Sequence, residues 1–261
     1  CPAQWVFGQA SYAFLSAGHI VCTYGEAEHT VLARLDTASG RLTPLALPYS
    51  EFGSVKIVDS PGGGKIVCGV GLPTVPGAIA VLDTATGAVE VLRQSSTAAA
   101  DPDLQRYFSV AQHLEFPTEH GLTAFANYYR PHNPDFAAPS GEKPPLVVKC
   151  HGGPTSSASS SLSLGIQYWT SRGIAVLAVD YGRSTGYGRA YRDPLKGQWG
   201  IVDVDDCVNA AKYAAAEGLA DAERAVITGG SAGGYTVLAA LAGRDFFKGG
   251  ASHYGVSDVA A

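Results

Sequence analysis

The chain has 261 residues, enough for one large domain or two smaller ones. Apolar residues make up 46% of it, which predicts a globular protein with a sizeable core. The formal net charge is −5 and no basic stripe occurs, so nucleic acid is excluded as an expected partner. No apolar stretch is long enough to cross a bilayer, so no membrane association is expected either.

The five cysteines are scattered, and none belongs to a Cys-x-x-Cys pair. This odd set favours reduced thiols and a cytoplasmic protein. The seven histidines do not cluster at metal-ligand spacing, so we expect no metal and no other cofactor. The chain contains no methionine and begins at Cys1, which leads us to expect a piece of a longer polypeptide.

An internal repeat of about 46 residues runs through residues 1–93. Leu35 to Gly40 (LDTASG) corresponds to Leu82 to Gly87 (LDTATG), and each segment reads as a hairpin turn. This period predicts the last blades of a β-propeller, although a β-sandwich fragment stays open. Because two blades cannot make a stable domain, further blades are expected before Cys1. The expected strands are 11–15, 19–24, 30–36 and 41–45, then 54–59, 65–71, 78–83 and 88–92.

Residues 94–107 are small and polar, and we interpret them as a linker. Residues 108–261 are then expected to form a second, incomplete domain. It starts with an antiparallel pair of strands at 108–116 and 121–130, followed by a proline-rich surface loop over 131–145.

From residue 146 onward, buried-type strands alternate with a helix. Strands are predicted at 146–150, 173–179 and 224–228, and a helix at 204–217 with Asp203 as its cap. Such alternation implies a parallel sheet, and ligands bind such sheets at the carboxyl ends of the strands.

The sequence Gly229-Gly230-Ser231-Ala232-Gly233 stands between a predicted strand and a predicted helix. It fits the nucleophile elbow Gly-x-Ser-x-Gly, in which glycines make room for a tight turn that exposes a serine hydroxyl. Ser231 is therefore the candidate nucleophile, and the Ala232 N–H at the helix start is a candidate oxyanion donor. The alternative is a glycine-rich turn or a phosphate loop, whose Lys-Ser/Thr signature is missing here.

The segment His151-Gly152-Gly153-Pro154 follows the strand at 146–150. A hydrolase builds its second oxyanion donor at this kind of position, so the Gly153 N–H is the second candidate donor. We interpret His151 as a structural or pocket-lining residue, because a general base should follow the serine in this fold. Tyr187 belongs to an aromatic loop after the next strand, which either packs or lines a substrate pocket.

Together, the blade repeats, the His-Gly-Gly-Pro and Gly-Gly-Ser-Ala-Gly-Gly motifs, and the segments 180–188 (DYGRSTGYG) and 197–200 (GQWG) resemble the prolyl oligopeptidase family of serine peptidases. The acylaminoacyl-peptidase and dipeptidyl-peptidase-like branch is the closer match. The resemblance implies an α/β-hydrolase domain under a β-propeller that admits short peptides or acylated peptides. It also implies that Val256 and Val259 line the substrate pocket. A homo-oligomer of the full-length protein is left open.

The chain departs from this pattern after the serine, where the triad acid and then the histidine should follow. Asp258 is a late acid, but no histidine comes after it. We therefore expect the triad acid and histidine beyond Ala261. A carboxylesterase of the same fold and a non-catalytic scaffold are the alternatives. The blade repeat argues against the first and the presence of Ser231 against the second.

Overall fold

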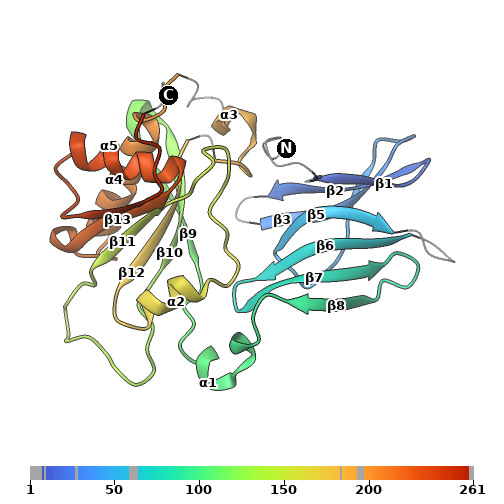
Figure 1. Cartoon of the computed structure of the whole chain (residues 1–261), viewed down its shortest axis with the longest axis horizontal. Helices are drawn as coiled ribbons and strands as arrows, with labels where there is room; N and C mark the ends of the chain where they lie inside the picture. Colours follow the sequence, from blue (N-terminus) through green and yellow to red (C-terminus); the bar gives the residue numbers. More distant parts are fainter. Residues whose placement is uncertain are drawn as a thin grey trace. The chain divides into compact units, whose positions relative to one another are not determined.

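The computed structural model describes residues 8, 10–26, 29–58, 64–182, 184–192 and 197–258. The chain divides into two compact units (Figure 1). Unit 1 comprises Cys1–Gln105 and Ser159–Leu162, and unit 2 comprises Arg106–Ala158 and Ser163–Ala261. No helix in the described ranges is long and apolar enough to span a membrane.

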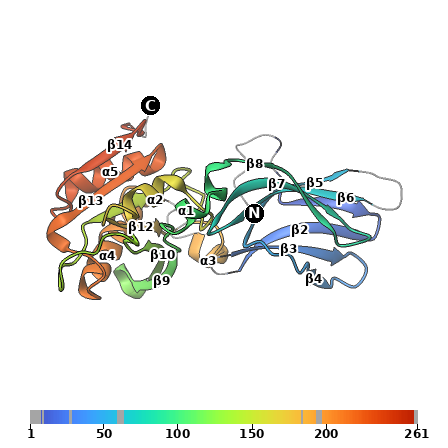
Figure 2. The same ribbon diagram turned by 90° about the horizontal axis from the view of Figure 1, so that it is seen from below.

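Unit 1 contains two four-stranded antiparallel sheets in which each strand pairs with the next along the chain (Figure 2). Side chains from both sheets share one core, which includes Leu32, Phe52 and Ile66. The repeat therefore folds as two successive blade-like sheets, as the sequence predicts. The first sheet holds β1 (Tyr12–Ser16), β2 (His19–Glu26), β3 (His29–Asp36) and β4 (Leu42–Pro44), and the second holds β5 (Glu51–Val58), β6 (Lys65–Leu72), β7 (Val75–Asp83) and β8 (Val89–Gln94).

The stretch that we interpret as a linker contains two short helices, η1 (Ala98–Ala100) and α1 (Pro102–Gln105). Unit 1 also includes Ser159–Leu162, a short excursion of the chain out of unit 2. The Glu51 carboxylate holds this excursion, because it accepts hydrogen bonds from the Ser159 hydroxyl and from the backbone N–H groups of Ser160 and Ser161. The domain boundaries at 93 and 107 stay predictions.

Unit 2 is built on a six-stranded mixed sheet of order β14-β13-β11-β12-β10-β9. Its strands are β9 (Gln112–Pro117), β10 (Thr123–Tyr129), β11 (Leu146–Cys150), β12 (Ala175–Asp180), β13 (Ala225–Gly230) and β14 (Gly250–His253). Strands β11, β12, β13 and β14 pair with one another in parallel, whereas β10 pairs antiparallel with both β9 and β12. All six residues of β12 are buried, which is typical of a strand covered on both faces.

Helices cover both faces of this sheet (Figure 1). On one face, α4 (Val202–Ala216) and α5 (Ala232–Gly243) contribute Val208 and Val237 to the main core. On the other, α2 (Leu164–Thr170) places Ile166 against Val147 and Val176. Within the described ranges, the remaining short helices are η2 (Glu119–Gly121), α3 (Gly188–Arg192) and η4 (Ala222–Arg224).

The interpretation of Asp203 as a helix cap is wrong. Helix α4 begins at Val202, and its N-cap residue is Ile201. Asp203 lies inside the helix with no exposed surface, where its carboxylate accepts hydrogen bonds from the Gly200 N–H at 2.6 Å and the Thr236 hydroxyl at 2.5 Å. Asp203 thus joins the turn before α4 to helix α5, a contact that periodicity alone could not reveal.

Candidate active site

The serine of the predicted elbow stands at the junction of β13 and α5. Ser231 has φ 55° and ψ −121°, a backbone conformation that is strained for any residue with a side chain. Its backbone is fixed on both sides, since the Ser231 N–H donates to the His253 carbonyl at 3.1 Å and the Ser231 carbonyl accepts from the Tyr235 N–H at 3.1 Å. The serine is exposed, as a nucleophile must be.

The glycines of the elbow are required by close backbone contacts. A Cβ atom on Gly229 would lie 2.5 Å from the Gly233 carbonyl oxygen, and a Cβ atom on Gly233 would lie 2.5 Å from the Cys150 carbonyl oxygen. Both distances are far below van der Waals contact. The predicted reason for glycine at these two positions is therefore confirmed.

The His151-Gly152-Gly153 loop lies beside the serine. Strands β11 and β13 are adjacent and parallel, with Cys150 opposite Gly229, so both loops leave the same edge of the sheet. A Cβ atom on Gly152 would lie 3.4 Å from Cβ of Ser231. Ala232 is buried at the amino terminus of α5, where the helix dipole favours negative charge. The turn at Gly152 and the amino terminus of α5 thus both lie at Ser231, and the oxyanion roles of Gly153 and Ala232 stay predictions.

The His151 ring contacts a backbone carbonyl, a hydroxyl and an aromatic ring. Its Nδ1 lies 2.9 Å from the Gly152 carbonyl oxygen. Its Nε2 lies 2.7 Å from the Ser184 hydroxyl, and its ring stacks on Tyr181 with centroids 4.3 Å apart. Burial lowers the pKa of His151 to about 4, so the ring is neutral at pH 7. This environment suits a structural role better than that of a general base.

A cavity of about 1100 Å³ opens at the serine. Ser231, His151 and Gly152 line it, together with His253 and Tyr254 after β14. It continues over the sheet face that carries α2, where Trp169, Val176 and Val226 contribute apolar surface.

Two of the residues expected in the substrate pocket have other contacts. Tyr187 stacks on Phe125 with ring centroids 4.3 Å apart, and its hydroxyl donates to the Asp180 carboxylate at 2.9 Å. The Val256 N–H donates to the Ser231 carbonyl at 3.4 Å. Val259 lies outside the described residues. The pocket roles of these three residues stay predictions.

Within the described ranges, no histidine ring hydrogen bonds to the Ser231 hydroxyl, and no group of His, Cys, Asp and Glu could hold a metal ion. Asp258 is exposed. The triad acid and histidine expected beyond Ala261 therefore stay a prediction.

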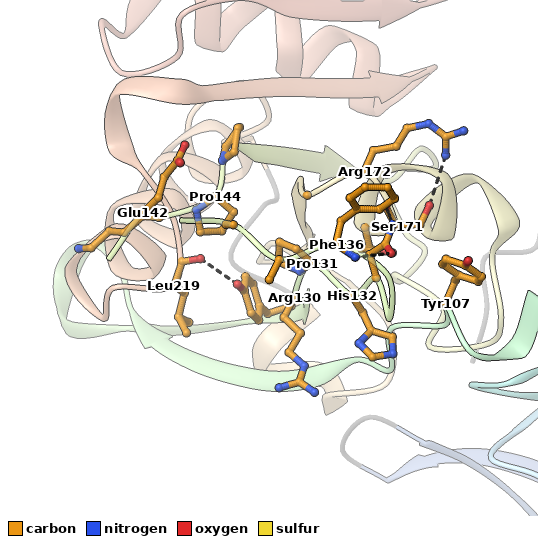
Figure 3. A pocket seen from close by; sticks show the side chains of 18 of the residues that line it. Tyr107, Arg130, Pro131, His132, Phe136, Glu142, Pro144, Ser171, Arg172 and Leu219 are labelled. Carbon is orange, nitrogen blue, oxygen red and sulfur yellow. Dashed lines mark hydrogen bonds between the residues drawn. The ribbon is translucent and has the colours of Figure 1, made fainter. Parts of the chain in front are cut away.

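A second cavity, of about 1280 Å³, lies at the opposite end of β11 and β12 (Figure 3). The proline-rich loop lines it through Pro131, Phe136 and Pro144, and the turn before β12 lines it through Ser171 and Arg172. Arg172 donates to the Ser171 hydroxyl and lies over the Tyr168 ring. This larger cavity contains no residue of the elbow, so cavity size alone would not have located the serine.

Sequence reasoning missed the carboxylate of Asp180, which is 2% exposed and ends β12. Its Oδ1 accepts a hydrogen bond from the Ala158 N–H at 2.6 Å, at the end of the loop that begins with His151. The available signal was its position, since an acid at the carboxyl end of a parallel strand lies beside the site.

A mixed sheet in which a parallel strand, β13, leads through a strained serine into a helix is typical of an α/β hydrolase. Residues 160–261 match the model of the prolyl oligopeptidase family, whose members are serine peptidases. This part of the chain is thus similar to that family, and the resemblance predicted from the sequence is confirmed. The predicted fold class, an α/β hydrolase preceded by blades of a β-propeller, is also confirmed.

Several known proteins are similar to the chain. A solved puromycin-hydrolyzing peptidase of Mycobacterium tuberculosis is 40% identical with a TM-score of 0.89, over 99% of this chain and 39% of that one. The dipeptidyl aminopeptidase BIII of Pseudoxanthomonas mexicana is 36% identical over 37% of this chain and 14% of its own length. The acylamino-acid-releasing enzyme of Arabidopsis thaliana is 38% identical over 37% and 13%. The chain therefore spans well under half the length of these relatives.

Proposed function

We propose that the complete protein is a serine peptidase that hydrolyses short peptides or acylated peptides through an acyl-enzyme on Ser231. The observation that carries this proposal is the strained backbone of Ser231, packed between glycines that admit no Cβ atom. Such strain persists only where the surroundings enforce it, and it serves to present a reactive hydroxyl.

In the proposed reaction, Oγ of Ser231 attacks the carbonyl carbon of the scissile amide, and its proton passes to a histidine beyond Ala261. The carbonyl oxygen becomes an oxyanion that the N–H groups of Ala232 and Gly153 stabilise, each by about 3–4 kcal/mol. The same proton then goes to the leaving amine, which departs. Water attacks the acyl-enzyme, and collapse of the second tetrahedral intermediate releases the acid and restores the serine.

The relatives are named for the release of dipeptides and of acylated amino acids and for the hydrolysis of puromycin, all of which are small groups or molecules. We propose substrates of this size for the present protein too. The described cysteines Cys22, Cys68, Cys150 and Cys207 are free thiols, which supports the proposal of a cytoplasmic location.

Labelling of the complete protein with a fluorophosphonate tests the proposal. We expect the label on Ser231 and, in Ser231→Ala, loss of both labelling and turnover of aminoacyl and acylaminoacyl anilides. The ratio of anilide to aryl-ester turnover then separates a peptidase from an esterase. Labelling of another serine, or full anilide turnover by Ser231→Ala, would overturn the assignment.

A further inference from the structure

The loop over residues 151–158 carries the proposed oxyanion donor Gly153 but has little structure of its own. It forms neither helix nor strand. Its internal hydrogen bonds run from His151 to the Gly152 carbonyl and from the Ser156 N–H to the Pro154 carbonyl. Groups outside the loop must therefore fix its shape.

Asp180 contacts this loop near both of its ends. It is the last residue of β12, and β12 pairs in parallel with β11, placing Val179 opposite Cys150. Its Oδ1 accepts a hydrogen bond from the Ala158 N–H at 2.6 Å, and Nε2 of the neutral His151 ring lies 3.9 Å away, beyond hydrogen-bond distance. The carboxylate thus binds the last residue of the loop and lies near the first.

The carboxylate is fixed from the other side as well. Oδ2 accepts a hydrogen bond from the Tyr187 hydroxyl at 2.9 Å. The Tyr187 ring lies flat on Phe125, at an interplanar angle of 3°, and Phe125 is the register partner of Asp180 on β10. The Tyr191 hydroxyl donates to the Asp180 carbonyl. Asp180 therefore contacts the loop with little freedom to move.

Other groups outside the loop contact it at similar distances. The Ser184 hydroxyl lies 2.7 Å from Nε2 of His151, and the Tyr181 hydroxyl donates to the His151 carbonyl at 2.8 Å. The Thr185 N–H donates to the Ser156 carbonyl at 2.6 Å, and Thr185 belongs to the segment that follows Asp180. Asn127 donates to the Ala158 carbonyl at 3.4 Å. Among these contacts, only that of Asp180 involves a buried carboxylate, and hydrogen bonds to ionised groups are stronger than neutral ones.

We propose that Asp180 is a positioning residue for the reaction at Ser231. By holding Ala158 and facing His151, it sets the path of the loop and so aims the Gly153 N–H at the oxyanion. Tyr187, which the sequence interpretation placed in a substrate pocket, would act here by fixing the carboxylate. The inference rests on the proposed function of Ser231 and goes beyond it by adding a residue that touches neither substrate nor serine.

The experiment compares Asp180→Ala, Asp180→Asn and Tyr187→Phe with the complete wild-type protein. In Asp180→Ala, we expect kcat for an anilide to fall about 100-fold, as for loss of one oxyanion donor, with KM changed by less than about threefold. Affinity for a peptide aldehyde, which forms a tetrahedral adduct with the serine, should fall by a similar factor. Affinity for the carboxylate product should not change.

Asp180→Asn should recover most of this loss, because its amide oxygen can still accept from the Ala158 N–H. Tyr187→Phe removes one hydrogen bond to Oδ2 and keeps the ring stack, so kcat should fall about threefold to tenfold. Asp205→Asn is the control, since Asp205 pairs with Arg244 on the surface. It should leave kcat and aldehyde affinity unchanged.

The outcomes separate this inference from the proposed function. If wild type is not labelled at Ser231 by a fluorophosphonate, the proposed function fails. If wild type is labelled but Asp180→Ala keeps wild-type kcat and aldehyde affinity, only the role of Asp180 is overturned. If Asp180→Ala does not fold, as judged by its thermal transition, Tyr187→Phe decides, and an unchanged kcat in that variant overturns the inference.

Discussion

The two units use aspartate in opposite ways. In the blades, Asp36 and Asp83 are partly exposed and close hairpin turns by accepting hydrogen bonds from backbone N–H groups two and three residues further on. Those N–H groups, from Ser39 and Thr86 above all, lower the pKa of the two carboxyls. Each turn is therefore stabilised by contacts between residues that are close in sequence.

In unit 2, Asp203 and Asp206 are buried on successive turns of α4 and hold segments that are distant in sequence. Asp206 accepts hydrogen bonds from the Gly182 N–H at 2.7 Å and from the Thr118 hydroxyl. Burial raises the pKa of both carboxyls, to about 6 for Asp206. The same side chain therefore stabilises a turn where it is solvated and incurs a desolvation cost where it joins remote loops.

Among the variants that test this difference between local and long-range contacts, we expect the largest loss of stability at Gly233. In Gly233→Ala, the new Cβ atom would lie 2.5 Å from one backbone carbonyl oxygen and 2.6 Å from another, those of Cys150 and His151. Because neither carbonyl can move without distorting β11 and the loop after it, we expect loss of about 3 kcal/mol or more of stability. Fluorophosphonate labelling of Ser231 should be lost as well.

Gly243→Ala is the matched control for that variant. Gly243 ends the same helix, and a Cβ atom there meets nothing within 4 Å. Unfolding in urea should show a gain of up to about 1 kcal/mol, from helix propensity. Equal losses in the two variants would contradict the packing argument.

A smaller effect, set by pH, is expected from Asp206. Burial raises its pKa to about 6 in the folded state, above the value of about 3.9 for an exposed aspartate, so the folded state binds the proton more tightly. The contribution of this carboxyl to stability is therefore complete below about pH 4 and is lost as the pH rises through about 6. The total loss is about 3 kcal/mol.

Urea unfolding of wild type and Asp206→Asn between pH 4 and pH 7 checks this expectation. As the pH rises from 4 to 7, the free energy of unfolding of wild type should fall relative to that of Asp206→Asn. Glu90→Gln, on the exposed side of β8, should show no such change. A constant difference for Asp206→Asn would mean that the buried carboxyl does not titrate there.

The smallest effect is expected in the blade turn. Gly87 has φ 73°, and a Cβ atom there would meet nothing within 4 Å. Gly87→Ala should therefore cost only the backbone strain of a positive φ, about 1 kcal/mol, and Gly87→Asn less, since asparagine tolerates this conformation. The shift of the unfolding midpoint measures both. A loss as large as that of Gly233→Ala would remove the distinction between local and long-range glycines.

The parts of the fold that rest on local signals could be predicted. The hairpin turns ending at Gly40 and Gly87, the repeat that they mark and the elbow around Ser231 all depend on residues close in sequence. The contacts of Asp180, Asp203 and Asp206 could not be predicted. Periodicity gives the strands and helices that carry these residues, but not which backbone N–H group of another loop each carboxylate meets.

The amino-acid sequence by itself determined which residues are the candidates for the reaction, because Gly-x-Ser-x-Gly between a strand and a helix is the pattern of a nucleophile elbow. Only the tertiary structure decided what holds these candidate groups in place. The partner of Asp180 is the N–H of Ala158, 22 residues away, and that contact exists because β11 and β12 lie side by side in the sheet. Hydrogen bonds act over about 3 Å, whereas sequence separation says nothing about distance once the chain has folded.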